Sequence, residues 1–140
     1  MVAFTHFQYT VDVDLDEGQS VGDDGSSACA YIFEIQVSTA AKGRGLGRRM
    51  MSIVEKLGAM EKLPKVTLTV FKMNLNAVRF YAKLGYVIDT AIDPNDEGEE
   101  DKEDSPDYFI LAKPLESTPP PEKYSNSLLL SYLERYKLVE

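Results

Sequence analysis

The sequence has few of the residues that build disulfides, metal centres and membrane spans. Its 140 residues include one cysteine, one histidine and no tryptophan. A lone Cys29 cannot form an internal disulfide, and with His6 as the only imidazole we expect no zinc site and no other metal. No apolar run reaches the roughly 18 residues of a membrane helix, and the N-terminus lacks the basic and apolar regions of a signal peptide. We therefore expect a protein of the cytoplasm and nucleus that does not enter membranes.

Charges of the two signs are concentrated in different parts of the chain, which has 15 basic and 23 acidic residues and a net charge of −8. Residues 93–107 hold nine acidic residues and one lysine, and residues 12–24 hold six acidic residues and no basic one. Residues 42–83 instead hold ten lysines and arginines against two glutamates. The acidic runs are typical of solvated loops, and they leave open that an acidic side attracts a cationic substrate while the basic part receives an anion. The acidic excess argues against direct nucleic acid binding.

Hydrophobic patterns predict strands separated by two helices. The predicted strands cover residues 2–13, 30–37, 66–71, 86–92 and 108–113. The first helix should end between Gly58 and Pro64, and its buried face should comprise Leu46, Met50, Ile53, Val54 and Leu57. The second helix should be capped by Asn74 and ended by Gly85. Its apolar face should comprise Ala77, Phe80, Tyr81 and Leu84.

This order of elements predicts an α+β fold with a mixed, mostly antiparallel sheet and flanking helices. Residues 1–115 are predicted to form one domain, and residues 116–124 a proline-rich linker. A C-terminal amphipathic helix is predicted within residues 125–140, because Leu129, Tyr132 and Leu133 recur at helical spacing.

A glycine-rich turn, Lys42-Gly43-Arg44-Gly45-Leu46-Gly47, lies between the second strand and the first helix. Glycines let the backbone approach an anion, and the free N–H groups and dipole of a helix start favour negative charge. The spacing does not fit a P-loop, and the chain is too short for a dinucleotide-binding fold. On its own, the turn is compatible with a pyrophosphate site and equally with a simple tight turn.

The turn resembles the Q/R-x-x-G-x-G/A signature of GNAT acetyltransferases, with Lys42 in the first position. The second GNAT signature, N-x-x-A-x-x-F/L-Y-x-x-x-G-F/Y, resembles the stretch that begins 32 residues later, through Asn74, Ala77, Phe80, Tyr81, Gly85 and Tyr86. Within the GNAT family, three segments resemble NatD-type N-alpha-acetyltransferases, which acetylate the N-terminal serine of histone 4 and histone 2A. These segments are Val2–Phe7, Tyr31–Val37 and Leu68–Lys72.

The resemblance covers residues 1–113 and implies a GNAT fold that is incomplete at its N-terminus, without the family's first strand, two helices and next strand. Three positions depart from the family pattern. Lys42 replaces a glutamine or arginine, Phe33 replaces a tyrosine, and Thr10 replaces an acidic substrate contact, with Asp12 close by.

The resemblance implies an acyltransferase that moves acetyl from acetyl-CoA to the alpha-amine of histone 4 and histone 2A N-terminal tails. It further implies that the chain is a monomer and that acetyl-CoA is its co-substrate. Two alternatives stay open. One is a general GNAT acetyltransferase acting on lysine or small amines, and the other is a catalytically impaired CoA-binding fragment.

The resemblance also implies roles for individual residues. Glu34 would act as general base through water, and Tyr81 would either protonate the leaving thiolate or only pack. The cofactor would contact the backbone of Ile35 and Val37, together with Lys42, Gly43, Arg44, Gly45, Leu46, Gly47, Asn74 and Tyr81. The substrate would contact Asp12, Tyr31, Phe33, Thr69 and Tyr108. Because GNAT enzymes need no nucleophilic residue, Cys29 is interpreted as core packing.

Overall fold

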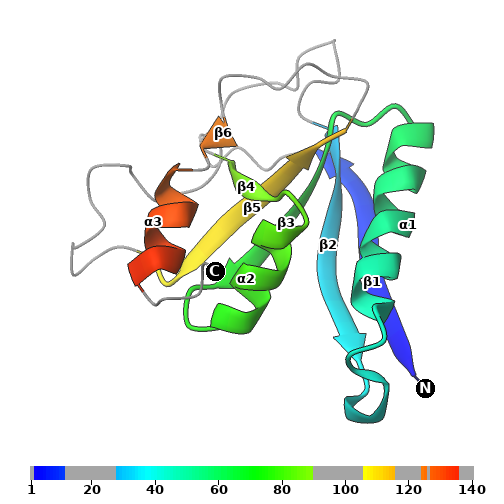
Figure 1. The fold of residues 1–140 in the computed structure, drawn as a ribbon. Helices are drawn as coiled ribbons and strands as arrows, with labels where there is room; N and C mark the ends of the chain where they lie inside the picture. The colour runs from blue at the N-terminus through cyan, green and yellow to red at the C-terminus, as the bar shows by residue number, and fades with distance from the viewer. Residues whose placement is uncertain (1, 12–27, 90–105, 116–123, 126, 136–140) are drawn as a thin grey trace. The chain divides into compact units, whose positions relative to one another are not determined.

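The structure, a computed structural model, describes residues 2–11, 28–89, 106–115, 124–125 and 127–135. The chain divides into two compact units. Unit 1 comprises Met1–Leu68 and Pro114–Pro119, and unit 2 comprises Thr69–Lys113 and Pro120–Glu140. The described strands follow the order β1-β2-β3-β5-β4-β6 in a mixed sheet, and β3 (Lys65–Phe71) contributes residues to both units (Figure 1). This arrangement confirms the predicted fold class.

Unit 1 is built on three strands and one long helix. Strand β1 (Ala3–Val11) runs antiparallel to β2 (Ala28–Val37), and β2 runs parallel to β3. A parallel pair needs a crossover, which α1 (Leu46–Met60) provides after a short 3-10 helix at Thr39–Ala41. Helix α1 lies along β2 and β1 (Figure 1). The buried residues of this unit include Ala30, Ile32, Met51, Val54, Val66 and Leu68.

A β-bulge interrupts β2 at Phe33. His6 of β1 pairs with Glu34, whereas the next residue, Phe7, pairs with Ile32, so Phe33 is the extra residue of the longer strand. Ile32 is buried, but Phe33 and Glu34 are both exposed. The bulge therefore directs two successive side chains to solvent where strict alternation would bury one of them.

The buried face of α1 differs from the predicted one. Met51 and Val54 are buried, whereas Ile53 is 55% exposed. The other predicted residues, Leu46, Met50 and Leu57, are half-buried. The prediction for Ile53 is wrong, because the helix turns the side of Met51 and Val54 toward the sheet. Apolar residues occupy several neighbouring faces of α1, so the sequence alone does not specify which face is buried.

Helix α1 ends at Met60, between Gly58 and Pro64 as predicted, and Gly58 itself lies inside the helix. A Cβ at Gly58 would lie 3.0 Å from Leu115 Cδ1 and 3.8 Å from Ala30 Cβ. The missing side chain therefore lets the helix approach both β2 and the segment that follows β5. Gly58 serves packing rather than helix termination.

In unit 2 the last residues of β3 lead into α2 (Leu75–Lys83), whose predicted boundaries are confirmed. The Asn74 side chain accepts the N–H of Ala77 at 3.4 Å, and Gly85 has a φ of 94° just after the helix. The three short strands that follow are β4 (Val87–Asp89), β5 (Tyr108–Pro114) and β6 (Tyr124–Ser125). Strand β4 pairs antiparallel with β5 on one side and with β6 on the other.

The C-terminal helix α3 (Ser127–Arg135) is anchored within unit 2. Leu129 and Leu133 are buried, as their spacing predicts. The Tyr132 hydroxyl donates a hydrogen bond to the Lys72 carbonyl, and its ring meets that of Phe109 edge-on with centroids 5.1 Å apart. The Lys72 ammonium lies 5.1 Å from the Phe109 ring centroid, a distance suited to a cation–π contact. The helix thus belongs to the same compact unit as β4 and most of β5. The domain boundaries drawn from the sequence stay a prediction.

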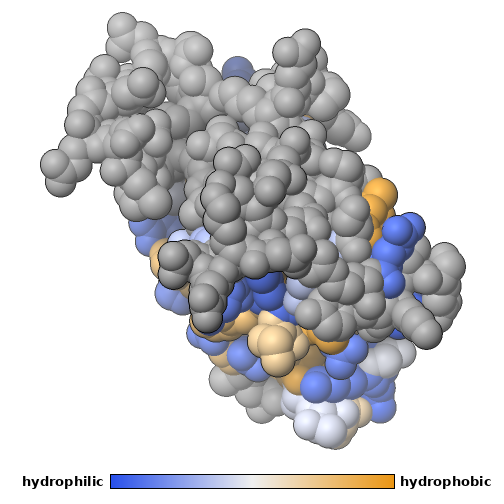
Figure 2. Space-filling view, turned by 90° about the vertical axis from the view of Figure 1, so that its left-hand side faces the viewer, coloured by the Kyte–Doolittle hydropathy of each residue, from blue (hydrophilic) through white to orange (hydrophobic). Residues whose placement is uncertain are grey.

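The surface mixes apolar and polar residues. In Figure 2, hydrophobic residues of the described part lie in small patches between hydrophilic ones. The described residues include no helix that is long and apolar enough to cross a membrane. They also include no cluster of three potential metal ligands among histidine, cysteine, aspartate and glutamate. The predicted acidic loops and the proline-rich linker lie almost entirely outside the described residues.

Candidate functional site

The glycine-rich turn adopts a backbone form that favours glycine. Gly43 and Gly45 have φ angles of 82° and 74°, in the left-handed region that a Cβ disfavours. Among the described residues, no atom lies within 4 Å of where a Cβ at either position would be, so this part of the structure leaves open space beside both glycines. Gly45 is the N-cap of α1, and its carbonyl accepts the N–H of Arg49 at 3.0 Å. The amides of the three residues between them have no acceptor within the helix and point out of its start.

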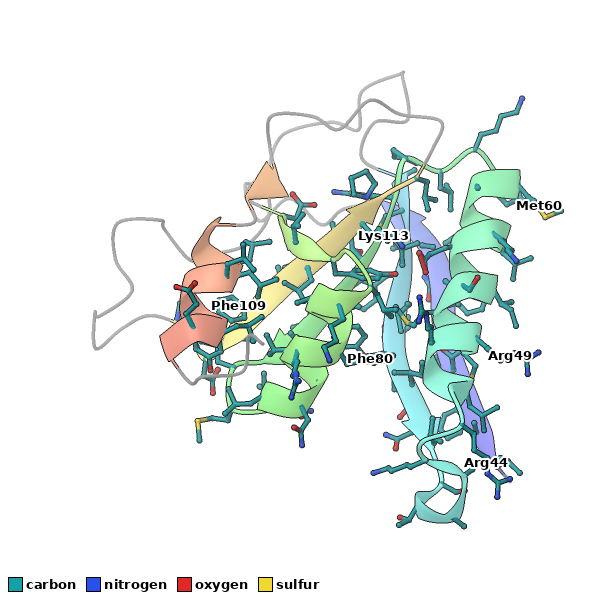
Figure 3. All side chains as sticks on the ribbon, viewed as in Figure 1. Arg44, Arg49, Met60, Phe80, Phe109 and Lys113 are labelled. Atoms are coloured by element: carbon teal, nitrogen blue, oxygen red, sulfur yellow. The ribbon has the colours of Figure 1, made fainter. Side chains whose placement is uncertain are left out.

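Basic side chains surround this helix start. Arg44, Arg48 and Arg49 are exposed, as is Lys42. Figure 3 shows Arg44 beside the turn and Arg49 on the outer side of α1. The first turn of α1 contains no acidic residue. Because the helix dipole adds partial positive charge at the same end, the turn suits an anion with several oxygens, such as a diphosphate.

The amides of Ile35 and Val37 point away from β1. Successive N–H groups alternate in direction along a strand. The N–H of Ser38 donates to the Val2 carbonyl at 2.8 Å, on the β1 side. The amides of Val37 and Ile35, one and three residues earlier, therefore point to the opposite side of β2. This direction agrees with the role that the resemblance implies for them.

One face of the β1–β2 pair combines aromatic rings with a carboxylate. Ala30 faces α1, since it contacts the Gly58 position, so its neighbour Tyr31 lies on the opposite face. The Phe33 ring meets the Tyr31 ring edge-on with centroids 4.9 Å apart. His6 stacks on Phe33 with centroids 4.8 Å apart and ring planes at 26°. Directly opposite residues of antiparallel strands share a face, so Glu34 lies beside His6. We call these four residues the His6–Glu34 face.

The structure therefore brings three predicted residues together on the His6–Glu34 face, namely Tyr31, Phe33 and Glu34. The Glu34 side chain is exposed, and its backbone carbonyl accepts a hydrogen bond from Thr5 Oγ1 at 3.1 Å. This bond ties the two strands together at the bulge. Predicted residue Asp12 lies outside the described residues.

Four further predicted residues belong to unit 2. Thr69 on β3 is exposed, and Tyr108 at the start of β5 is half-buried. The Asn74 side-chain oxygen is the cap of α2, which gives this residue a structural role whatever else it binds. Tyr81 lies two turns further along the same helix.

Tyr81 is only 8% exposed. Its ring contacts those of Phe80 and Tyr86, with centroids 5.2 and 5.9 Å away. Burial raises the pKa of the Tyr81 hydroxyl above its ordinary value of 10.0. The hydroxyl is therefore protonated at neutral pH, as a proton donor must be. The same contacts serve packing, so both roles inferred from the sequence remain open.

Cys29 is buried, and its sulfur accepts a hydrogen bond from Thr67 Oγ1 at 3.4 Å. This position fits the interpretation as core packing. His6, in contrast, is a candidate site residue that the sequence did not predict, since it entered there only as a possible metal ligand. Its place beside Glu34 depends on strand register across two distant segments. Alternation along β1 indicates that residues 4, 6 and 8 share a face, but it does not identify what lies opposite.

The model of the Acetyltransferase (GNAT) family matches residues 10–86, which is more than half of the chain. The chain belongs to the GNAT family. Both GNAT signatures recognised in the sequence lie within the matched residues, one at the turn before α1 and the other beginning at the cap of α2. The NatD type stays a prediction.

The chain is also similar in sequence to two acetyltransferases. N-alpha-acetyltransferase 40 from Saccharomyces cerevisiae is 33% identical over 91 residues, which cover 60% of this chain and 32% of the relative. Spermine/spermidine N(1)-acetyltransferase from Bacillus subtilis is 24% identical over 76 residues, covering 54% of this chain and 50% of the relative. The chain thus spans about a third of the first relative's length and half of the second's.

The solved structures confirm the GNAT fold. Naa20 from Chaetomium thermophilum, solved in complex with a bisubstrate analogue, matches with a TM-score of 0.64 and 19% sequence identity. The match covers 90% of this chain and 66% of the Naa20 chain. At this identity the likeness is one of fold.

Proposed function

We propose that this chain binds acetyl-CoA at the glycine-rich turn and transfers its acetyl group to the amine at a peptide N-terminus. The observation that carries the proposal is the left-handed turn of Gly43 and Gly45 at the start of α1, in a chain of the GNAT family. The residues of the turn fit the diphosphate of acetyl-CoA, because the described residues leave open space beside the two glycines and Arg44 supplies positive charge there. The amides of Ile35 and Val37 are the proposed donors to the acetyl carbonyl and the pantetheine arm.

The proposed task of the side chains is to supply a neutral amine and to manage protons. A peptide α-amine ordinarily has a pKa of about 7.7–8.0, so its neutral form costs only about 1 kcal/mol at pH 7, against about 4–5 kcal/mol for a lysine. A weak base acting through water is sufficient for the α-amine. Glu34, exposed on the His6–Glu34 face, is the proposed base. Tyr81, protonated at neutral pH, is the proposed donor to the departing thiolate.

The proposed substrate is the Ser-Gly-Arg-Gly tail of histone 4 and histone 2A, acetylated by a monomer in the cytoplasm and nucleus. Similarity to yeast N-alpha-acetyltransferase 40 supports this choice. The charge distribution is compatible with it, since an acidic chain with Glu34 on its open sheet face suits a basic tail. Thr69 and Tyr108 are proposed as further substrate contacts, together with Tyr31, Phe33 and Asp12.

A second candidate is acetylation of a small polyamine, which the similarity to the Bacillus subtilis spermine/spermidine acetyltransferase favours. A polyamine is a cation without a peptide backbone, so it needs carboxylates but no strand surface. The two candidates therefore differ in whether a blocked peptide or a free polyamine is accepted.

The test incubates the protein with acetyl-CoA and three acceptors, namely a Ser-Gly-Arg-Gly peptide, a lysine-containing peptide with a blocked α-amine, and spermidine. We expect acetylation of the free α-amine only, read by mass spectrometry. Replacement of Glu34 by glutamine should slow it by about 10²–10⁴-fold, the usual contribution of a general base. Gln36, exposed two residues further along β2, provides the control, and Gln36→Ala should retain the wild-type rate. Preference for spermidine or for the blocked peptide would overturn the N-terminal assignment.

A further inference from the structure

The single histidine of the chain lies at the centre of the His6–Glu34 face. In the β1–β2 register, His6 is directly opposite Glu34, at the position where the bulge begins. The Cβ atoms of directly opposite residues lie about 4.5–5.5 Å apart. The two side chains therefore leave neighbouring backbone positions on a face that is turned away from α1.

Stacking orients the His6 ring without using its nitrogen atoms. The ring lies on Phe33 with centroids 4.8 Å apart and planes at 26°, and Tyr31 contacts Phe33 edge-on at 4.9 Å. Such a stack uses the ring faces and leaves Nδ1 and Nε2 at the ring edge. His6 is also exposed. An incoming group and solvent can therefore both reach the imidazole edge.

The proposed reaction has to remove a proton from an ammonium group, and carboxylate and imidazole groups in general differ in how well they accept it. A carboxyl of glutamate ordinarily has a pKa of about 4.3, an imidazole about 6.5 and a peptide α-amine about 7.7–8.0. Transfer from the amine to an imidazole is therefore unfavourable by about 15- to 30-fold, and transfer to a carboxylate by about 3,000-fold. Proton transfer is most effective with an acceptor whose pKa is near the working pH.

We propose that His6 is the final proton acceptor for the substrate amine, a role that rests on the proposed function. Glu34, the base of the proposed function, passes the proton on through a water: one N–H bond of the ammonium breaks, and an N–H bond forms on the imidazole. The products of this step are a neutral amine and an imidazolium. The carboxylate of Glu34 stabilises the imidazolium, and exposure lets the proton pass on to solvent. The titratable groups that face His6 from β2 are Glu34 and Tyr31, and α1 lies on the other face.

Nuclear magnetic resonance tests this assignment on the unaltered protein, because one histidine gives one set of imidazole signals. The protein, free of any histidine tag and saturated with CoA, is titrated in pH with a Ser-Gly-Arg-Gly peptide and with its N-acetylated form. The free ammonium should lower the midpoint of the His6 titration by about half a unit, which is the effect in water of a unit charge about 5 Å away. The N-acetylated peptide should not. Equal midpoints with the two peptides would overturn the proposal.

Kinetics supply a second test. His6→Phe retains a flat ring that can stack on Phe33 and removes the proton acceptor. Its rate should fall by about 5- to 10-fold near pH 7, which is the ratio of protonated to neutral α-amine at that pH. The deficit should shrink as the pH rises above about 8, because the amine is then already neutral. Gln8, exposed two residues further along β1, provides the control, and Gln8→Ala should follow the wild-type pH profile.

The two proposals fail in distinguishable ways. A wild-type protein that acetylates no peptide while the His6 midpoint still responds to the free ammonium contradicts the proposed function and supports the His6 contact. A wild-type protein that acetylates the peptide, with a His6→Phe variant of unchanged pH profile, supports the function and overturns the role of His6.

Discussion

At the scale of single residues, the account depends on two glycines whose backbone form is set by the turn. Gly43 and Gly45 take positive φ angles and border open space, so they are required by the chain's path and not by a neighbouring side chain. Any residue with a Cβ meets a conformational cost there. A side chain at either position also enters the space proposed for a diphosphate.

Replacement of Gly45 separates these two effects. Gly45→Ala should lower the free energy of unfolding by about 1 kcal/mol, because alanine disfavours a φ of 74°. Gly45→Asn should cost less, since asparagine tolerates the left-handed region. Both variants should weaken CoA binding by about tenfold or more, because a side chain in the space of the diphosphate should displace it from at least one charge-assisted hydrogen bond. Urea unfolding and calorimetry measure the two quantities, and unchanged CoA affinity in both variants would contradict the assignment of the turn.

Tyr81 provides a prediction about pH. Its pKa is raised in the folded protein by burial, so the folded state binds the proton more tightly than the unfolded state does. Its contribution to stability is therefore complete below about pH 10 and is lost as the pH rises through the higher folded-state value. Tyr81→Phe removes this titration and keeps the ring. In urea unfolding between pH 8 and 11, the wild type should lose stability faster than the variant above about pH 10. Parallel curves would show that Tyr81 titrates normally.

The structural roles of some residues were predictable from the sequence, and those of others were not. The cap at Asn74 and the glycine at Gly85 were predictable, because caps are local signals within a few residues. The packing role of Gly58 was not, because Leu115 approaches it from a segment 57 positions away in the sequence. His6 beside Glu34 has the same origin, since it depends on the register of two separate strands.

At the scale of elements, hydrophobic patterns located the helices and most strands. The extent of β3 was predicted to within one residue, since the strand covers Lys65–Phe71 and residues 66–71 were expected. The buried side of α1 was not, since apolar residues occupy more than one face and the sheet selects the side of Met51. The bulge at Phe33 and the two-residue strand β6 have no distinct pattern of their own, because both are defined by pairing with another strand.

The C-terminal helix α3 provides a prediction at this scale. Leu133 is 3% exposed and Leu130 is 41% exposed on the same helix. Leu133→Ala should lower the free energy of unfolding by about 2–5 kcal/mol, because it leaves a cavity within unit 2. Leu130→Ala, the matched control, should cost less than about 1 kcal/mol. Urea unfolding followed by circular dichroism measures both, and equal small effects would show that α3 is not part of the core of unit 2.

At the scale of the whole molecule, family membership and geometry support each other. The family match over residues 10–86 includes the turn, both GNAT signatures and three of the four residues of the His6–Glu34 face. The fourth residue, His6, lies shortly before the start of the match. Composition alone limited the class of protein, and two short signatures identified the family. Substrate choice was not predictable in the same way, because the residues proposed to contact the substrate, among them Asp12 and Tyr108, come from separate segments of the chain. The chain also spans only 32% of its yeast relative.

The central claim is that the turn after β2 binds the diphosphate of CoA, and calorimetric titration of CoA into the folded wild-type chain tests it most directly. We predict saturable binding of one CoA per chain, weakened by Gly45→Asn and by added salt, which screens the exposed arginines around the turn. A protein that unfolds cooperatively, and is therefore folded, yet releases no heat and shows no saturation with CoA would contradict the account.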